Sequence, residues 1–365
     1  MRFECKLRKT RVDLSRQLAL NEWLGKQLKK QMTTKQEESI IIFRPHEAGG
    51  LGNAIRGYIS AMLLVILYKT AFKVDSFNDF LRVLFFNPFP NTGGPFHHNN
   101  SIQHNWSCHP SLSFEVQDSS LSLLHNSTVD LFVTTIYDAV SLIRTNQYDE
   151  GLKAAGFLPF DHPVRGKERE EQIQYTLLRI LLNPSSELCG VIQKYITAMK
   201  NHYSIGLQLR VGGKLKNAND AVFLGMERIR WCISRVRRII RQLQTVHPIL
   251  FLSTDSIAIQ QAVVDSFYPI QVLYVTEYQM GHSASRYGKH GGKETWEEAT
   301  KRAIIDIMVL KECDHLMTTH NSSFGGIAVL LQQSYELEVS VDSFLKERGL
   351  KCSAFTNRST IGTNE

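Results

Sequence analysis

Residues 205–213 have the sequence IGLQLRVGG, and the fold prediction starts from this stretch. Its apolar first half is typical of a buried strand, and Arg210 and two glycines follow where the strand ends. From here to residue 333, predicted strands and helices alternate. The strands are expected at 205–209, 249–252, 271–275 and 315–318, and the helices at 222–244, 257–267, 294–312 and 324–333. This alternation predicts parallel βαβ units in a Rossmann-like domain.

A second α/β unit is predicted upstream. Residues 39–43 (SIIIF) are typical of a strand, the glycine loop 49–53 (GGLGN) follows, and an apolar helix is expected over 54–68. Further strands are expected at 71–75 and 129–134. The chain is therefore divided into a basic N-terminal arm (1–38), an N-terminal α/β domain (39–200), a C-terminal Rossmann-like domain (201–345) and a tail (346–365).

The composition is that of a globular protein, with 43% hydrophobic and 21% charged residues in a chain of 365. The net charge of +7 lies almost entirely in residues 1–30, where nine basic and three acidic residues give +6 and leave +1 for the rest. A nucleic-acid partner is therefore not expected. The most apolar stretch, 58–68, has eleven residues, too few for a membrane span, which needs about 20.

The sequence contains neither a secretory signal nor a metal-binding motif. The start of the chain lacks an apolar core region, which indicates a cytosolic protein or a chain without its targeting segment. The six cysteines form no CxxC pair, and the four histidines between 97 and 109 lack ligand spacing, so we expect no metal site. Five Asn-x-Ser/Thr sequons, more than chance predicts, favour a secretory lumen. They are Asn99, Asn105, Asn126, Asn321 and Asn357.

Three loops at predicted strand ends carry residues suited to ligand binding. The loop 46–53 (HEAGGLGN) offers backbone N–H groups at a helix start, although a purely structural tight turn explains it equally well. Arg210 can bind phosphate oxygens through its guanidinium, and an ordinary surface ion pair is the alternative. The loop 319–326 (THNSSFGG) places two serines at a helix start, where they bind an anion or only cap the helix.

Taken in order, GGLGN, IGLQLR, FLSTD (251–255) and NSSFGG (321–326) resemble the motifs of GDP-fucose-dependent fucosyltransferases. This superfamily includes α1,2-, α1,6- and protein O-fucosyltransferases. The resemblance covers about residues 39–340 and is strongest to the xyloglucan-type α1,2 group, whose strand motif also has Gln before the Arg. It implies an α/β, GT-B-like fold with two Rossmann-like domains facing a cleft. The N-terminal domain would then face the acceptor, and the C-terminal domain would bind GDP-fucose.

The resemblance also implies roles for individual residues. Arg210 matches the arginine that grips the β-phosphate of GDP, and Asp306 matches the aspartate that reaches the guanine. Glu47, just ahead of the glycine loop, is the first candidate for a general base. Gln208 stands where many relatives have His, which removes one donor to the diphosphate. The other donor-binding residues are Asp255, Ser322, Ser323 and Phe324, and the cleft loop contains Gly50, Gly52 and Asn53.

The implied activity is inverting transfer of L-fucose from GDP-fucose to a hydroxyl of a glycan or glycoprotein acceptor, with α1,2 as the expected linkage. No metal or other cofactor is expected, because Arg210 and oriented N–H groups stabilise the departing GDP and no Asp-x-Asp motif is present. Relatives usually reside in the Golgi, and this implies the secretory lumen. Asn321 would then be unmodified, because a glycan there would block the pocket. An inactive module that binds a GDP-sugar or glycan, and a GT-B glycosyltransferase with another donor, are the two alternatives.

Overall fold

The structure, a computed structural model, describes the two α/β units and the elements that join them. Its described residues are 40–43, 50–68, 71–74, 131–133, 152, 170–171, 173–175, 177–178, 182, 184–214, 219–243, 247–281, 283, 293–319 and 322–332. The arm 1–38, the tail 346–365, Glu47 and all five sequon asparagines lie outside these residues.

The C-terminal unit is built on a four-stranded parallel sheet in the order β8-β7-β4-β9. Its strands are β4 (Tyr203–Leu209), β7 (Pro248–Thr254), β8 (Val272–Leu273) and β9 (His315–Thr318). The two central strands, β4 and β7, are buried at six of their seven positions. Such strands need cover on both faces, which explains their nearly continuous apolar sequence.

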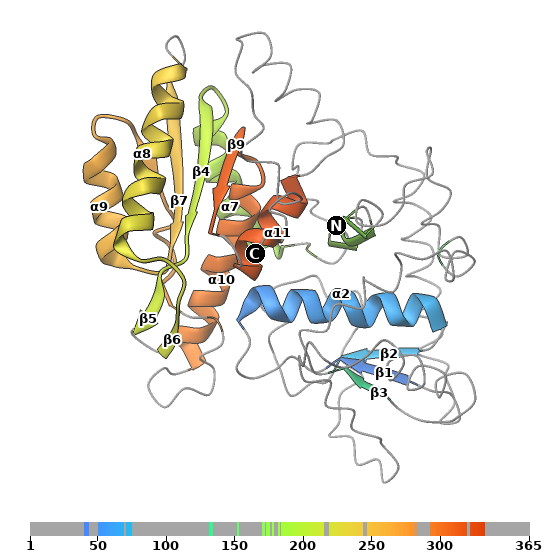
Figure 1. Ribbon diagram of the computed structural model, residues 1–365. Coiled ribbons are helices and arrows are strands. Elements are labelled where there is room, and N and C mark those ends of the chain that lie inside the picture. The colour runs from blue at the N-terminus through green and yellow to red at the C-terminus, as the bar shows by residue number, and fades with distance from the viewer. Residues whose placement is uncertain are drawn as a thin grey trace, which may run out of the picture.

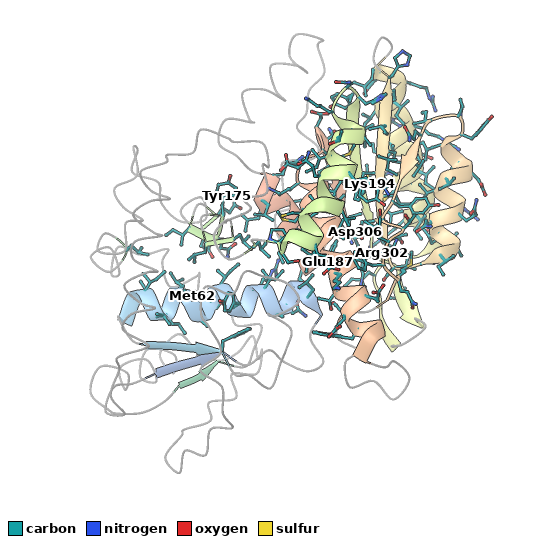
Figure 2. The ribbon with its side chains drawn as sticks, turned by 180° about the vertical axis from the view of Figure 1, so that it is seen from behind. Met62, Tyr175, Glu187, Lys194, Arg302 and Asp306 are labelled. Carbon is teal, nitrogen blue, oxygen red and sulfur yellow. The ribbon has the colours of Figure 1, made fainter. Side chains whose placement is uncertain are left out.

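Helices cover both faces of this sheet (Figure 1). On one face, α8 (Met226–Gln242) and α9 (Ile257–Phe267) pack their apolar sides on alternate strand residues such as Leu207 and Leu252. On the other face, α7 (Ser186–Met199), α10 (Lys293–Leu310) and α11 (Ser323–Gln332) share one core with Phe251. Seen from behind, α7 lies in front of the sheet (Figure 2). The sheet edge between these helix layers is where ligands bind in open α/β folds.

The N-terminal unit has a three-stranded parallel sheet in the order β2-β1-β3 among its described residues. The strands are β1 (Ile40–Phe43), β2 (Ala71–Val74) and β3 (Leu131–Val133), and α2 (Leu51–Tyr68) follows β1. The ring centroids of Phe43 and Tyr58 are 5.3 Å apart, which fixes α2 on the sheet. The other face of α2 contacts α11, and its first turn points toward the C-terminal unit (Figure 1).

Several element ends differ from the sequence prediction; α8, for example, begins at Met226 and not at residue 222. Two differences concern the pocket region. The helix α2 begins at Leu51, so Gly52 and Asn53 belong to its first turn and not to the preceding loop. An antiparallel hairpin, β5 (Gly212–Lys214) with β6 (Asn219–Val222), was not predicted. Its short strands lack apolar alternation, and the pairing is irregular between Gly212 and Lys214. Gly212 and Gly213 of β5 have φ angles of 71° and 74°, which favour glycine.

The helix α7 precedes the predicted domain boundary at residue 200, yet it packs against α10 of the C-terminal unit. The boundaries themselves stay predictions. Among the helices that the structure describes, none combines the length and the apolar character needed to cross a bilayer.

Candidate functional site

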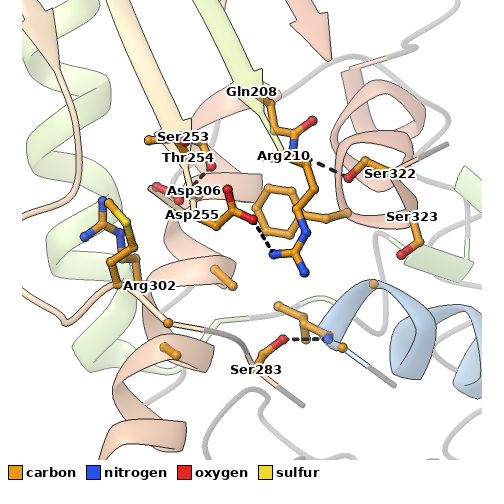
Figure 3. Close-up of a pocket in the computed structure, with 18 of the residues that line it drawn as sticks. Gln208, Arg210, Ser253, Thr254, Asp255, Ser283, Arg302, Asp306, Ser322 and Ser323 are labelled. Atoms are coloured by element: carbon orange, nitrogen blue, oxygen red, sulfur yellow. Dashed lines mark hydrogen bonds and ion pairs between the residues drawn. The ribbon is translucent and has the colours of Figure 1, made fainter. Parts of the chain in front are cut away.

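A pocket of about 270 Å³ lies where the carboxyl ends of β4 and β7 face the first turns of α2 and α11 (Figure 3). The structure thus brings together residues of the three loops that were predicted at strand ends. The sequence-predicted residues that line the pocket are Gly50, Gly52, Asn53, Arg210, Asp255, Asp306, Ser322, Ser323 and Phe324. Its volume is near the lower end for small-molecule sites, which span roughly 300–1,000 Å³.

Arg210 leaves the end of β4 with its guanidinium held on two sides. Its Nη1 lies 3.1 Å from Oδ2 of Asp255, and the guanidinium carbon lies 5.5 Å from the centroid of the Phe223 ring. Its backbone N–H donates to Oγ1 of Thr319 at 2.8 Å, which ties β4 to the end of β9. The side chain keeps 19% of its surface exposed, and Arg210 lines the pocket.

Asp255 organises the loop after β4. Its two carboxylate oxygens accept the N–H groups of Val211 and Gly212 at 2.8 and 2.9 Å, in addition to the ion pair with Arg210. These contacts within the chain orient both the turn and the arginine. The nucleotide contact expected of Asp255 stays a prediction.

Gln208 connects β4 to the start of α11. Its Oε1 accepts the N–H of Thr319 at 2.9 Å, and its Nε2 donates to Oγ of Ser322 at 3.4 Å. The same Ser322 hydroxyl accepts the N–H of Gly325 at 3.2 Å, so Ser322 caps α11. The capping explanation therefore holds for Ser322, while Ser323, the first residue of the helix, stands next to the pocket.

The first turns of α2 and α11 meet at Gly52. A Cβ atom at this position would lie 2.6 Å from the backbone nitrogen of Phe324 and 2.6 Å from Oγ of Ser323. No side chain fits there, which explains the glycine in the first turn of α2. The N–H of Leu51 donates to Oγ of Ser283 at 2.8 Å, a second link across the pocket. Two helix N-termini therefore border one pocket, an arrangement that favours an anion.

Asp306 lies deep in the pocket wall, on α10. The hydroxyl of Ser253 donates to its Oδ2 at 2.8 Å, and among the described residues its Oδ1 has no hydrogen-bond partner. Burial raises the pKa of Asp306 to about 6, while Arg302 and the Ser253 hydroxyl act in the opposite direction. An unpartnered carboxylate oxygen in a pocket wall is suited to accept N–H groups from a ligand.

Arg302 also lines the pocket, and sequence reasoning missed it. Its Nη1 donates to the carbonyl of Tyr278 at 3.4 Å and its Nη2 to Oε1 of Gln260 at 3.2 Å. It stands four residues before Asp306, which puts both side chains on one face of α10. That spacing is a signal from which Arg302 could have been found.

This arrangement combines a guanidinium, two helix N-termini and a buried carboxylate. The first two suit an anionic group such as a diphosphate, and the carboxylate suits a neutral ring that carries N–H donors. Among the residues that the structure describes, no group of three or more His, Cys, Asp or Glu side chains is placed to hold a metal ion. That the reaction needs no metal stays a prediction.

Several solved structures with similar folds are fucosyltransferases. A mutant of FUT1 from Arabidopsis thaliana in complex with GDP has 15% identity and a TM-score of 0.52, with 87% of this chain and 75% of that chain covered. Fucosyltransferase NodZ from Bradyrhizobium has 16% identity and a TM-score of 0.48, with 80% and 93% covered. POFUT1 in complex with GDP has 10% identity and a TM-score of 0.40, with 82% and 96% covered. No family model and no curated protein sequence matches the chain.

The likeness to FUT1 shows the fold of this chain. The prediction of an α/β, GT-B-like architecture with a parallel sheet in each unit is therefore confirmed.

Proposed function

We propose that this protein is a glycosyltransferase that moves L-fucose from GDP-fucose to a hydroxyl of a glycan or glycoprotein acceptor. The observation that carries the proposal is the convergence of three features on one pocket: Arg210, the first turn of α11, and Oδ1 of Asp306, which has no partner among the described residues. A nucleoside diphosphate sugar has matching parts, namely a diphosphate with a base at one end and a sugar at the other.

The catalytic role of the pocket follows from where charge develops. When the bond between fucose and phosphate breaks, the sugar becomes oxocarbenium-like and negative charge builds on the leaving GDP. Arg210 and the N–H groups at the start of α11 stabilise that charge at the position where it forms. Asp255 and Gln208 hold these two groups in place, which avoids reorganisation during the reaction.

The acceptor hydroxyl would attack from the side of the N-terminal unit in a single displacement, which inverts the anomeric configuration. Glu47, which lies outside the described residues, is the candidate base just ahead of the cleft loop. Gln208, two residues before Arg210, supports the α1,2 type, since the xyloglucan-type motif has the same pair. The sequons support a secretory compartment for the reaction.

Ligand-dependent unfolding tests the donor first. Binding to the native state raises the melting temperature, and ligand at about 100 times its Kd adds about 2.7 kcal/mol. We expect GDP to stabilise the protein and equal concentrations of UDP and ADP to do so much less. Preferential stabilisation by UDP would overturn the choice of donor and favour a different GT-B transferase.

Turnover tests the reaction itself. GDP release from GDP-fucose would be followed over an array of glycan acceptors, and the product linkage and anomeric configuration read by NMR. We expect one acceptor class to accelerate release, with α1,2 linkage and inversion. GDP binding without turnover on any acceptor would favour the inactive sugar-binding module instead.

A further inference from the structure

Two buried polar atoms in the pocket wall lack partners in the part of the chain that the structure describes. They are Oδ1 of Asp306, a residue only 4% exposed, and Nε of Arg302, a residue only 8% exposed. Buried polar groups are nearly always hydrogen-bonded, because a buried group without a partner bears the full cost of its lost hydration. Both residues line the same pocket. Their unused hydrogen-bonding capacity is therefore suited to a ligand that enters the pocket.

The two atoms are complementary, since one accepts and the other donates a hydrogen bond. Arg302 and Asp306 stand at positions i and i+4 of α10, so both project from one face of the helix. The terminal nitrogens of Arg302 donate to Tyr278 and Gln260, which fixes the side chain, and Nε is the guanidinium nitrogen without a partner among the described residues. Such a pair fits a planar ring that shows a donor and an acceptor on adjacent atoms.

Guanine has this pattern and adenine has the opposite one. Guanine presents N1–H and a 2-amino group as donors beside O6 as an acceptor, whereas adenine presents a 6-amino donor beside an N1 acceptor. In the view of Figure 3, Arg302 and Asp306 lie on one side of Arg210, and Ser322 and Ser323 lie on the other. A nucleotide whose diphosphate reaches Arg210 and α11 can therefore extend its base toward Arg302 and Asp306.

We propose that Arg302 is a specificity-determining residue that donates from Nε–H to O6 of the guanine base, beside Asp306. This inference rests on the proposed function, because it assumes that a nucleoside diphosphate occupies the pocket. It assigns the selection against a 6-amino group to Arg302. A purine with an amine at position 6 would set a donor against a donor and would give Nε no acceptor.

Calorimetric titration of three nucleotides tests the assignment. GDP and IDP share O6, and IDP lacks the 2-amino group, while ADP has an amine at position 6. For the wild type we expect GDP to bind tightest and IDP to bind at least about tenfold tighter than ADP. In Arg302→Met, GDP and IDP weaken together by about tenfold or more while ADP is unchanged, so the ratio of IDP to ADP affinity falls by that factor.

Lys301→Met is the matched control. Lys301 is the preceding residue of α10 and loses the same charge, but its amine lies 2.9 Å from Glu187 of α7 and the residue does not line the pocket. Because Arg302 lowers the pKa of Asp306, its removal raises that pKa above the value of about 6 in the wild type. The titrations are therefore run at pH 7 and at pH 8, and affinity ratios that agree at the two pH values exclude an effect through protonation of the carboxyl. We expect Lys301→Met to keep the affinity ratios of the wild type.

The outcomes separate this inference from the proposed function. If the wild type binds none of the three nucleotides, the proposed function fails. If the wild type binds GDP but IDP and ADP equally well, Arg302 does not read position 6, and this result needs no variant to fold. An unchanged ratio of IDP to ADP in folded Arg302→Met, or the same fall in Lys301→Met, would likewise overturn the assignment and leave the proposed function intact.

Discussion

Replacing Asp306 with Asn tests two consequences of burying a carboxyl group in the pocket wall, namely its effect on stability and its effect on GDP binding. Burial raises the pKa of Asp306 from 3.8 to about 6. The difference corresponds to about 3 kcal/mol, since one pKa unit is worth about 1.4 kcal/mol. Because the folded-state pKa lies above that of the unfolded chain, the stabilising contribution of the protonated carboxyl is fully present below pH 3.8 and is lost as the pH rises through about 6.

Asn is neutral at every pH, and its amide oxygen can still accept the bond from Ser253. We therefore expect Asp306→Asn to match the wild type near pH 4 and to exceed its free energy of unfolding by up to about 3 kcal/mol at pH 8, measured by urea denaturation. The affinity for GDP should change in the opposite sense. An amide offers one acceptor where the carboxylate offers two, and calorimetry at pH 8 should show about a hundredfold loss.

The wild type carries a further signature of the same group. Its GDP affinity should decline as the pH falls below about 6, where the carboxyl becomes protonated, and the affinity of the Asn variant should not. Asp265→Asn on the exposed side of α9 is the matched control and should alter neither quantity. A variant that is no more stable than the wild type at pH 8 would show that Arg302 fully compensates the buried charge. Undiminished GDP affinity would show that the base lies elsewhere.

Three other changes test the site and the fold. Arg210→Ala should lower kcat/KM for GDP-fucose, with a loss of about 2–4 kcal/mol of transition-state stabilisation. Arg230→Ala on the exposed face of α8 should leave kcat/KM unchanged. Wild-type turnover in folded Arg210→Ala would contradict the role of Arg210. Gly52→Ala should reduce the free energy of unfolding by about 1–3 kcal/mol and weaken GDP binding, because the new Cβ would lie 2.6 Å from atoms of α11. Gly190→Ala on α7 is the comparison, since a Cβ there would meet nothing within 4 Å, and this change should stabilise the protein by about 0.4–1 kcal/mol. Equal effects of the two glycine changes in denaturation would refute the close contact. Burial lowers the pKa of His315 from 6.5 to about 4, so its contribution is present above pH 6.5 and is lost as the pH falls toward 4; replacing it with Gln should flatten this part of the stability profile, and an unaltered profile would count against the buried neutral imidazole.

Periodicity located most elements of the C-terminal unit. The predicted bounds of β9 and α9 agree with the structure at both ends, because a short apolar run and a capped amphipathic helix are strong local signals. The start of α2 was predicted wrongly for a physical reason. Glycines usually mark a loop, but Gly52 lies in the first turn of a helix. It is a glycine because a second helix approaches too closely for any side chain.

Local sequence patterns predicted pocket residues only at strand ends, and Asp306 on α10 was predicted from the family resemblance alone. Arg210 and Ser323 were found because loops after parallel strands meet at one edge. Arg302 and Ser283 come from a helix and an irregular segment, for which no local pattern shows where they lie in the fold. Gln208 shows a different limit of sequence-based prediction. A Gln where many relatives have His suggests a lost ligand contact, whereas the structure shows that Gln208 links β4 to α11.

The contact at Gly52 also restricts how the two units can move relative to each other. Since backbone of α2 lies against backbone of α11, the two units have no compressible side chain between them at this point. Separation there would expose tightly packed main chain, so a swing of one unit against the other is easiest with this contact as its fulcrum. The side of the pocket farthest from Gly52 would then widen most, and the nucleotide of the proposed reaction would enter and leave on that side.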